Sequence, residues 1–182
     1  FLGPDSYRFA DLILARMGTL PPGARILDYG AGAGVGGIVA ARNAPGAVLT
    51  LADVNHKALF LASINAEHGG VEHATVEATT PADVPGSFDL IVTHPPFMID
   101  RGRRAYRDGG DLYGARLSLE WVLAGVEKLT PGGRLILAGL LDTQADRVAA
   151  AYRRCGLALS FRIDRGDWPT LAMRKRRSTG WR

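Results

Sequence analysis

The sequence predicts one α/β domain in which helices cover both faces of a seven-stranded, mostly parallel sheet. The chain has 182 residues, of which 47% are hydrophobic and 22% are charged, and this balance excludes a disordered or collagen-like protein. Its longest apolar run, residues 135–141, is far shorter than the ~20 residues that a membrane-spanning helix needs. Short β-type runs alternate with helical segments along the whole chain, which is typical of a parallel sheet.

The first half of the chain contains apolar runs that stop at glycine, proline or polar residues. We expect strands at residues 25–29, 48–53, 73–77 and 88–93. Helices accompany them at residues 9–17, 35–43 and 57–68. The last of these helices has its apolar residues at helical spacing and ends at a pair of glycines, as helices commonly do.

The second half continues the alternation with a helix, a strand, another helix and two final strands. These elements are predicted at residues 117–129, 134–140, 143–155, 158–163 and 170–175. A turn at 130–133 closes the first helix, and a turn at 165–169 joins the last two strands. Because parallel sheets bind ligands at the carboxyl ends of their strands, we expect functional residues directly after strands.

A glycine-rich loop follows the first strand and reads Asp28-Tyr29-Gly30-Ala31-Gly32-Ala33-Gly34-Val35-Gly36-Gly37. Glycine lets a ligand approach the backbone without a Cβ in the way, and the amides at a helix start favour a carboxylate or phosphate. The alternation of Gly30, Gly32 and Gly34 favours a nucleoside-type cofactor. Two alternatives stay open, since Gly32-x-Gly34-x-x-Gly37 also matches a dinucleotide spacing and the loop could be only a tight turn.

Two carboxylates favour the nucleoside interpretation. Asp53 ends the second strand, about 20 residues after the loop, where a carboxylate can accept hydrogen bonds from both ribose hydroxyls. Asp28 lies two residues before the first glycine of the loop. A negative charge there disfavours the phosphates of a dinucleotide.

The loop and its carboxylates resemble two motifs of the class I S-adenosylmethionine-dependent methyltransferases. The segment from Asp28 to Gly34 is similar to their first motif, and Leu51-Ala52-Asp53-Val54-Asn55 is similar to their second. The resemblance implies a Rossmann-like sheet with a closing antiparallel hairpin and S-adenosyl-L-methionine as cofactor. It also implies that the loop receives the methionine end and that Asp53 binds the ribose. Similar enzymes often place a carboxylate beside the adenine at the end of the third strand, and a backbone amide near Ala78 or Thr79 is expected to replace it here. The predicted cofactor-binding residues are Asp28, Gly30, Ala31, Gly32, Gly34, Asp53, Val54, Ala78 and Thr79.

The fourth strand ends in His94-Pro95-Pro96-Phe97, the most specific stretch of the chain. Prolines have no amide hydrogen, so they end strand pairing and stiffen the turn, while their carbonyls remain acceptors. An acceptor beside the flat ring of Phe97 suits a planar nitrogen, such as an amide or a base amino group. The alternative is a rigid stop with Phe97 in the core.

This stretch resembles the Asn-Pro-Pro-aromatic motif of methyltransferases that act on glutamine amides and on the amino groups of adenine and guanine. Their small-domain members are the most similar. The resemblance implies that Pro95, Pro96 and Phe97 hold the target nitrogen, with the Pro95 carbonyl as an acceptor. His94 stands where Asn, Asp or Ser is usual. A neutral imidazole can accept a hydrogen bond from the substrate or act as a general base; a structural hydrogen bond and altered or lost chemistry are the alternatives.

Three further segments are candidates for contacts with substrate or cofactor. The loop at residues 98–114 holds four arginines, three aspartates and two tyrosines, and is either a substrate-binding loop or an internally salt-bridged surface loop. Residues 1–20 are expected to form a helix segment over the cofactor, as in similar enzymes. The tail at 174–182 has five basic residues and no acidic one, which suits either RNA contacts or a solvated end.

The sequence therefore predicts that residues 1–182 form a single methyltransferase domain, with the catalytic residues His94, Pro95, Pro96 and Phe97. It would transfer a methyl group from S-adenosyl-L-methionine to a planar nitrogen of an RNA base or a protein glutamine. A non-catalytic cofactor-binding or RNA-binding module and an NAD-type oxidoreductase are the alternatives. The single cysteine, Cys155, cannot form an internal disulfide, so a cytoplasmic location is expected. No metal is expected, because the other histidines lack ligand spacing, and no membrane partner is expected.

Overall fold

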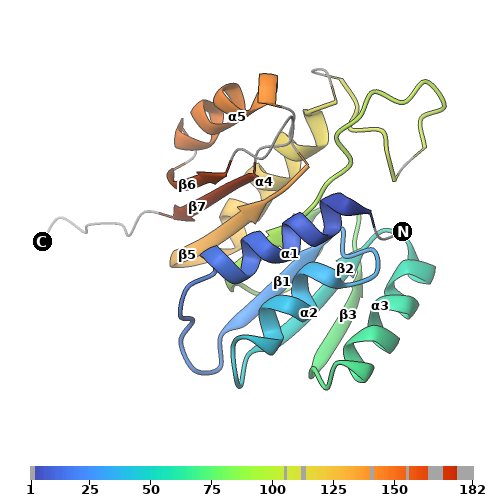
Figure 1. Cartoon of the computed structure of the whole chain (residues 1–182), viewed down its shortest axis with the longest axis vertical. Coiled ribbons are helices and arrows are strands. Elements are labelled where there is room, and N and C mark those ends of the chain that lie inside the picture. The colour runs from blue at the N-terminus through green and yellow to red at the C-terminus, as the bar shows by residue number, and fades with distance from the viewer. Residues whose placement is uncertain are drawn as a thin grey trace, which may run out of the picture.

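The structure is a computed structural model that describes residues 3–104, 106–111, 114–139, 142–154, 156–163 and 170–175. The predictions that concern Tyr113, Cys155, the turn at 165–169 and residues 176–182 of the tail lie outside the described residues. The elements follow one another in the order shown in Figure 1. They are α1 (Pro4–Arg16), β1 (Arg25–Tyr29), α2 (Val35–Arg42), β2 (Val48–Asp53), α3 (His56–His68), β3 (His73–Glu77), η1 (Pro81–Asp83), β4 (Phe88–Thr93), α4 (Arg116–Lys128), β5 (Leu129–Leu137), α5 (Asp142–Arg154), β6 (Leu157–Ile163) and β7 (Thr170–Lys175).

The strands form one seven-stranded sheet in the order β3-β2-β1-β4-β5-β7-β6. Strands β1 to β5 pair in parallel, whereas β7 lies antiparallel between β5 and β6. This arrangement confirms the predicted Rossmann-like fold with a closing antiparallel hairpin.

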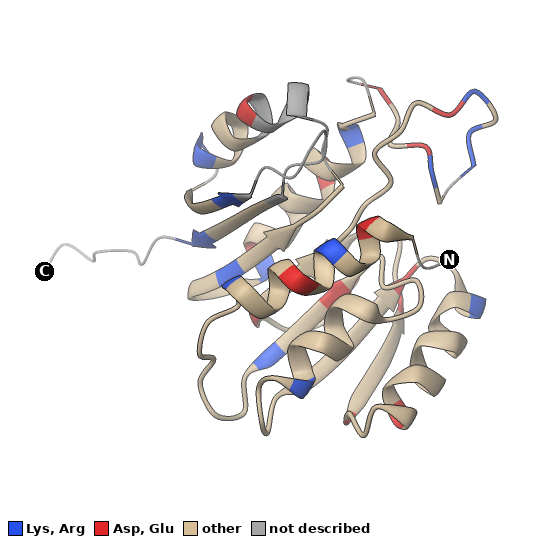
Figure 2. Ribbon diagram, viewed as in Figure 1, with Lys and Arg blue, Asp and Glu red and all other residues tan. Residues whose placement is uncertain are grey.

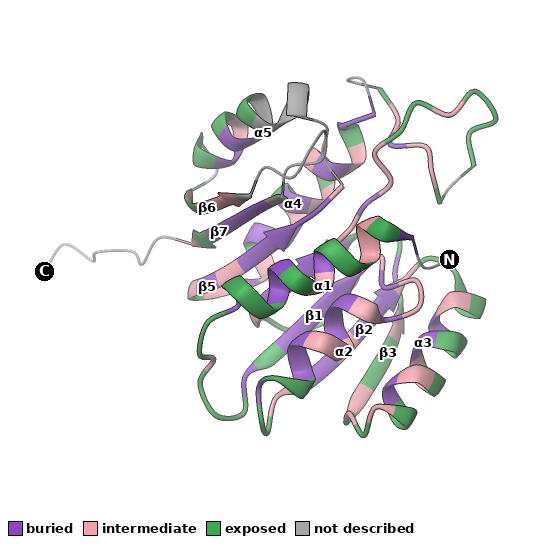
Figure 3. Ribbon diagram, viewed as in Figure 1, coloured by how far each residue is buried: buried purple, intermediate pink, exposed green. Residues whose placement is uncertain are grey.

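The central strands are buried on both faces, which explains why they read as continuous apolar runs. Neighbouring residues of β1 point to opposite faces. Ile26 packs in a cluster with residues of α1, α2 and α3, and Leu27 packs in a second cluster with residues of α4 and α5. Figure 3 shows the buried residues concentrated on these strands and on the helix sides that face them.

Helix α1 begins at Pro4, so the predicted start at residue 9 is wrong. Proline is well suited to a first helical position, where its missing amide hydrogen costs nothing, and the Ser6 hydroxyl accepts a hydrogen bond from the Gly3 amide (3.4 Å). Phe9, buried on this helix, packs on α2, where a Cβ at Gly36 would lie 2.6 Å from the Phe9 ring. Tyr7 of the same helix is 66% exposed and therefore lies outside the core.

Strand β5 also differs from its prediction, because it begins at Leu129 and ends at Leu137. Leu129 pairs with Phe88, and the next pair, Arg134 with Leu90, follows after an irregularity in the register. The residues predicted as a turn, 130–133, form this irregular part of the strand. The Thr130 hydroxyl donates a hydrogen bond to the Asp89 carboxylate (2.8 Å), which holds the segment against β4.

The carboxyl ends of β1 to β5 meet at one edge of the sheet, because these strands are parallel. The glycine-rich loop, Asp53, Ala78, His94 and Gly139 therefore gather at this edge, each just after or at the end of a different strand. Within the described residues, none of the helices has the length and apolar character needed to cross a bilayer.

Candidate functional site

The glycine-rich loop is packed tightly at two of its glycines and open at the third. A Cβ at Gly30 would lie 2.6 Å from the Trp121 ring, and one at Gly34 would lie 3.0 Å from the Ile38 side chain. A Cβ at Gly32 would meet no atom within 4 Å. Gly32 has a φ of 54°, a backbone conformation that favours glycine. Gly32 is thus the position where the loop faces open space that a ligand could enter.

Asp53 fixes the loop to the end of β2. Its Oδ2 accepts a hydrogen bond from the Gly32 amide (2.9 Å), and its Oδ1 accepts one from the Asn55 amide (2.9 Å). Each carboxylate oxygen has a second lone pair, so the half-buried Asp53 can still accept hydrogen bonds from a ligand hydroxyl. Val54, which follows it, is 60% exposed on the same edge of the sheet.

Asp28 lies behind the loop and is 2% exposed. Its Oδ2 accepts a hydrogen bond from the Gly37 amide in the first turn of α2 (2.7 Å). Burial raises the pKa of the Asp28 carboxyl to about 7, with a further contribution from the charge of Asp53, although the Gly37 hydrogen bond opposes it. The charge of Asp28 is therefore partly suppressed near neutral pH, so it disfavours a bound phosphate less than the sequence suggested.

At the end of β3 the structure distinguishes Ala78 from Thr79, which the sequence could not. The Ala78 amide donates to the Asp53 carbonyl (3.1 Å), and the Ala78 carbonyl accepts a hydrogen bond from the Tyr29 hydroxyl (3.4 Å). The Ala78 amide therefore already has a partner within the fold. Thr79 is exposed, and its amide has no partner among the described residues.

The stretch after β4 lies beside the end of β1, because the Thr93 hydroxyl donates to the Tyr29 carbonyl (2.8 Å). The His94 ring stacks on the ring of Phe97, with the centroids 5.9 Å apart and the planes 5° from parallel. Phe97 is only partly buried, so the alternative of a rigid stop with Phe97 in the core is wrong. The predicted catalytic residues are therefore adjacent in space as well as in sequence.

Helix α1 brings a carboxylate to His94. The His94 Nε2 lies 3.6 Å from the Asp5 Oδ2, and the His94 side chain is 19% exposed. Its ring also lies 5.5 Å from the ring of Phe9. Burial lowers the pKa of His94, and the charge of Asp5 partly opposes this shift. The imidazole is therefore neutral at neutral pH, with a carboxylate at its Nε2 side.

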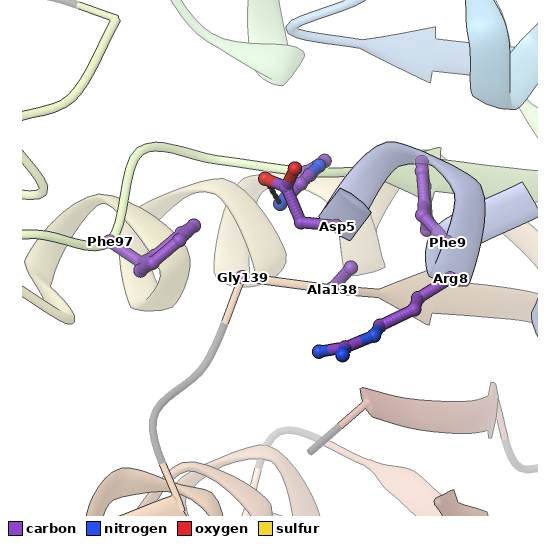
Figure 4. Close-up of a pocket in the computed structure, with 7 residues that line it drawn as sticks. Asp5, Arg8, Phe9, Phe97, Ala138 and Gly139 are labelled. Carbon is purple, nitrogen blue, oxygen red and sulfur yellow. Dashed lines mark ion pairs between the residues drawn. The ribbon is translucent and has the colours of Figure 1, made fainter. Parts of the chain in front are cut away.

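A pocket lies between α1, the stretch after β4 and the end of β5 (Figure 4). It is lined by Asp5, Arg8, Phe9, His94, Phe97, Ala138 and Gly139. The sequence predicted a helix segment over the cofactor at residues 1–20, but it did not point to Asp5 beside His94 or to Gly139. No sequence signal pointed to them, because Gly139 falls inside the strand predicted at 134–140 and the approach of α1 to β4 depends on contacts distant in sequence.

Gly139 packs closely against the stretch after β4. It has a φ of 75°, and a Cβ at this position would lie 2.8 Å from the Pro95 carbonyl oxygen, 2.8 Å from the Phe97 ring and 2.9 Å from the His94 ring. No side chain therefore fits at residue 139 without displacing one of the three groups predicted to hold the target nitrogen. Among the described residues, no group of three His, Cys, Asp or Glu side chains could hold a metal ion.

Comparison with known proteins gives consistent matches to methyltransferases. The family model described as "Methyltransferase small domain" matches residues 9–145, and the model described as "Ribosomal protein L11 methyltransferase" matches residues 122–176. The ribosomal protein L11 methyltransferase of Bordetella parapertussis is 33% identical over 171 residues, which are 93% of this chain and 48% of that protein. The ribosomal RNA small subunit methyltransferase C of Ectopseudomonas mendocina is 31% identical over 118 residues, which are 58% of this chain and 35% of that protein. The chain thus spans about half the length, or less, of these relatives.

Solved structures share the fold at low sequence identity. The ribosomal protein L11 methylase of Lactobacillus delbrueckii subsp. bulgaricus has a TM-score of 0.77 at 21% identity, covering 96% of this chain and 80% of that chain. The 16S rRNA N2 G1207 methyltransferase of T. thermophilus, solved with AdoMet and guanosine, has a TM-score of 0.70 at 19% identity and covers 97% of this chain and 44% of that chain.

Proposed function

This chain belongs to the methyltransferase small-domain family, whose members use S-adenosylmethionine, and from that premise we propose that it methylates a planar nitrogen of an RNA base or a protein glutamine. The resemblance drawn from its sequence motifs is confirmed, and the family excludes the NAD-type oxidoreductase alternative. The nature of the relatives supports a macromolecular acceptor, because their names specify a ribosomal protein and ribosomal RNA. We further propose that the reaction takes place in the cytoplasm, which suits a chain with one cysteine.

The edge of the sheet offers groups that fit the cofactor. We assign the methionine end to the open backbone at Gly32, the ribose to the remaining lone pairs of Asp53, and the adenine edge to the Thr79 amide. Asp28 supports this cradle from behind through the Gly37 amide. When bound, S-adenosylmethionine supplies a methyl group on a positively charged sulfur, which an aligned nucleophile displaces in line.

The pocket on α1 and β4 is assigned to the acceptor nitrogen. A carboxylate near Nε2 of a neutral imidazole favours the tautomer with its proton on Nε2, which leaves Nδ1 as a hydrogen-bond acceptor. His94 would then accept a hydrogen bond from the target N–H, as the Asn of similar enzymes does, and can also hold its proton after transfer. The ring of Phe97 would align the planar group.

One observation carries this proposal: the His94 ring stacks on the Phe97 ring in the lining of a pocket that also contains Asp5. A pocket lined by an imidazole and an aromatic ring, with a carboxylate beside the imidazole, fits a planar nitrogen.

The test is methyl transfer from radiolabelled S-adenosylmethionine into whole-cell RNA and protein, followed by separate nuclease and protease digestions. We expect label in one macromolecular fraction, and the digestion that releases it identifies the acceptor class. His94→Ala should abolish the transfer, whereas His68→Ala, on the exposed end of α3, should not. Tight cofactor binding without any transfer would instead favour the non-catalytic module, an alternative that the histidine at residue 94 keeps open.

A further inference from the structure

The loop that follows Phe97 is held firmly against the pocket. The Met98 amide donates to the Arg107 carbonyl (3.1 Å), and the Gly109 amide donates to the Met98 carbonyl (2.8 Å). Gly109 and Gly114 lie so close to the carbonyls of Pro96 and Phe97 that neither position has room for a Cβ. The base of the loop, at Met98, Gly109 and Gly114, thus packs on the predicted catalytic stretch. The outer end of the loop projects from the domain (Figure 1).

The three aspartates of this loop form ion pairs or hydrogen bonds within the loop or at its base. Asp100 has a side chain that is only 10% exposed and forms a 2.7 Å ion pair with Arg104. This pairing holds the pKa of the Asp100 carboxyl well below its usual range. Asp108 accepts hydrogen bonds from the amides of Asp100 (3.4 Å) and Gly110 (3.3 Å). Asp111 pairs with Arg116 of α4 (3.3 Å).

The outer end of the loop is therefore more basic than its composition indicates. Arg101 and Arg103 are exposed, and neither forms an ion pair with a carboxylate among the described residues. Figure 2 shows the basic segments along this outer end. Tyr106 is 70% exposed, and the Arg104 guanidinium lies 5.9 Å from the centre of its ring.

We propose that this outer end, formed by Arg101, Arg103 and Tyr106, binds the single-stranded RNA segment that carries the acceptor base. Guanidinium groups neutralise phosphates, and an exposed aromatic ring stacks on an unpaired base; the two together are typical of surfaces that bind single-stranded nucleic acid. An acidic protein segment would use the arginines but would leave the exposed ring without a stacking partner. The inference rests on the proposed function and chooses RNA between its two acceptor classes.

The test is the binding of a fluorescently labelled, unstructured 12-nucleotide RNA to the full chain, measured by anisotropy at several salt concentrations. The charge-reversal variant Arg101→Glu/Arg103→Glu should weaken binding at least ~10-fold. It should also reduce the slope of log K against log [salt] by about 1.4, which corresponds to the loss of about two phosphate contacts. Tyr106→Ala should weaken binding by about 5-fold or more without changing the salt dependence, since stacking is uncharged. All variants should bind S-adenosylmethionine like the wild type, which shows that they are folded.

The matched control is Arg42→Glu/Arg153→Glu, which makes the same change in net charge at exposed positions at the ends of α2 and α5. It should alter the RNA affinity less than ~3-fold. The proposal is overturned if the loop variant binds RNA no more weakly than this control. It is also overturned if the loop variant loses methyl transfer to protein while RNA binding is unaffected. Because binding is measured without turnover, a failure of methyl transfer would refute the proposed function and leave the RNA-binding result to be judged separately.

Discussion

Replacing Asp28 by asparagine should stabilise the protein, and should do so more strongly as the pH rises. Asp28 is buried, and its carboxyl has a pKa of about 7 instead of the usual 3.8. Between these two values the folded state binds a proton that the unfolded state has released, so stability falls as the pH increases through this window. The amide side chain of the Asp28→Asn variant would carry no charge at any pH, and its oxygen could still accept the hydrogen bond from the Gly37 amide.

The size of the effect follows from the two pKa values. The raised pKa of Asp28 should cost the folded state about 1.7 kcal/mol at pH 5, where the buried carboxyl still holds its proton, and about 4 kcal/mol at pH 8, at about 1.4 kcal/mol per pH unit between the two pKa values. The stability difference between Asp28→Asn and the wild type should therefore widen by about 2.5 kcal/mol over this range. With a typical urea dependence of about 2 kcal/mol per molar, the gap between the two unfolding midpoints widens by about 1 M.

Urea unfolding at pH 5, 6, 7 and 8 measures this difference directly. Asp11→Asn is the matched control, because Asp11 is exposed on α1 and the change in charge is the same. Its unfolding curves should differ from the wild type by a nearly constant amount at every pH. Parallel behaviour of Asp28→Asn and the wild type would contradict this prediction, since it would mean that Asp28 does not change its ionisation upon unfolding in this range.

Three further predictions concern the site. Asp5→Asn should lower kcat about 10-fold and move the acid limb of the pH profile of kcat to lower pH, because the charge of Asp5 raises the pKa of His94. His94→Asn should remove that limb. Unchanged pH profiles in both variants would exclude Asp5 and His94 from the reaction. Gly139→Ala should destabilise the protein by about 2–4 kcal/mol in thermal unfolding and impair methyl transfer, because it adds a clash to the strain of a positive φ. Gly156→Ala is the control, since a Cβ there would meet open space, and it should cost only about 1 kcal/mol in the same assay. Asp53→Ala should weaken S-adenosylmethionine binding about 100-fold by calorimetry, since it removes the acceptor for the Gly32 amide as well as for the ribose. Wild-type affinity in this variant would contradict the assignment of Asp53 to the ribose.

The sheet and the position of its edge could be predicted from sequence because they depend on local patterns. An apolar run that stops at a glycine or proline defines a strand and its end, and in a parallel sheet those ends share one edge. The errors lie where local signals compete. Residues 130–133 look like a turn, yet they form an irregular part of β5, because Leu129 before them and Arg134 after them both pair with β4. The start of α1 was missed because the helix signal of Pro4 precedes the apolar residues that suggested the helix.

The class of fold, the glycine-rich loop with Asp53 and the His94–Phe97 stretch could therefore be predicted from local sequence, since each of these is contiguous or follows a strand. The surroundings of these segments depend on the folded structure. It brought Asp5 to His94 and Gly139 to the Pro95 carbonyl, and it paired Asp100 with Arg104 and Asp111 with Arg116 while Arg101 and Arg103 stayed exposed. Such contacts join residues far apart in the chain or depend on the direction of single side chains, and a linear pattern contains neither kind of information.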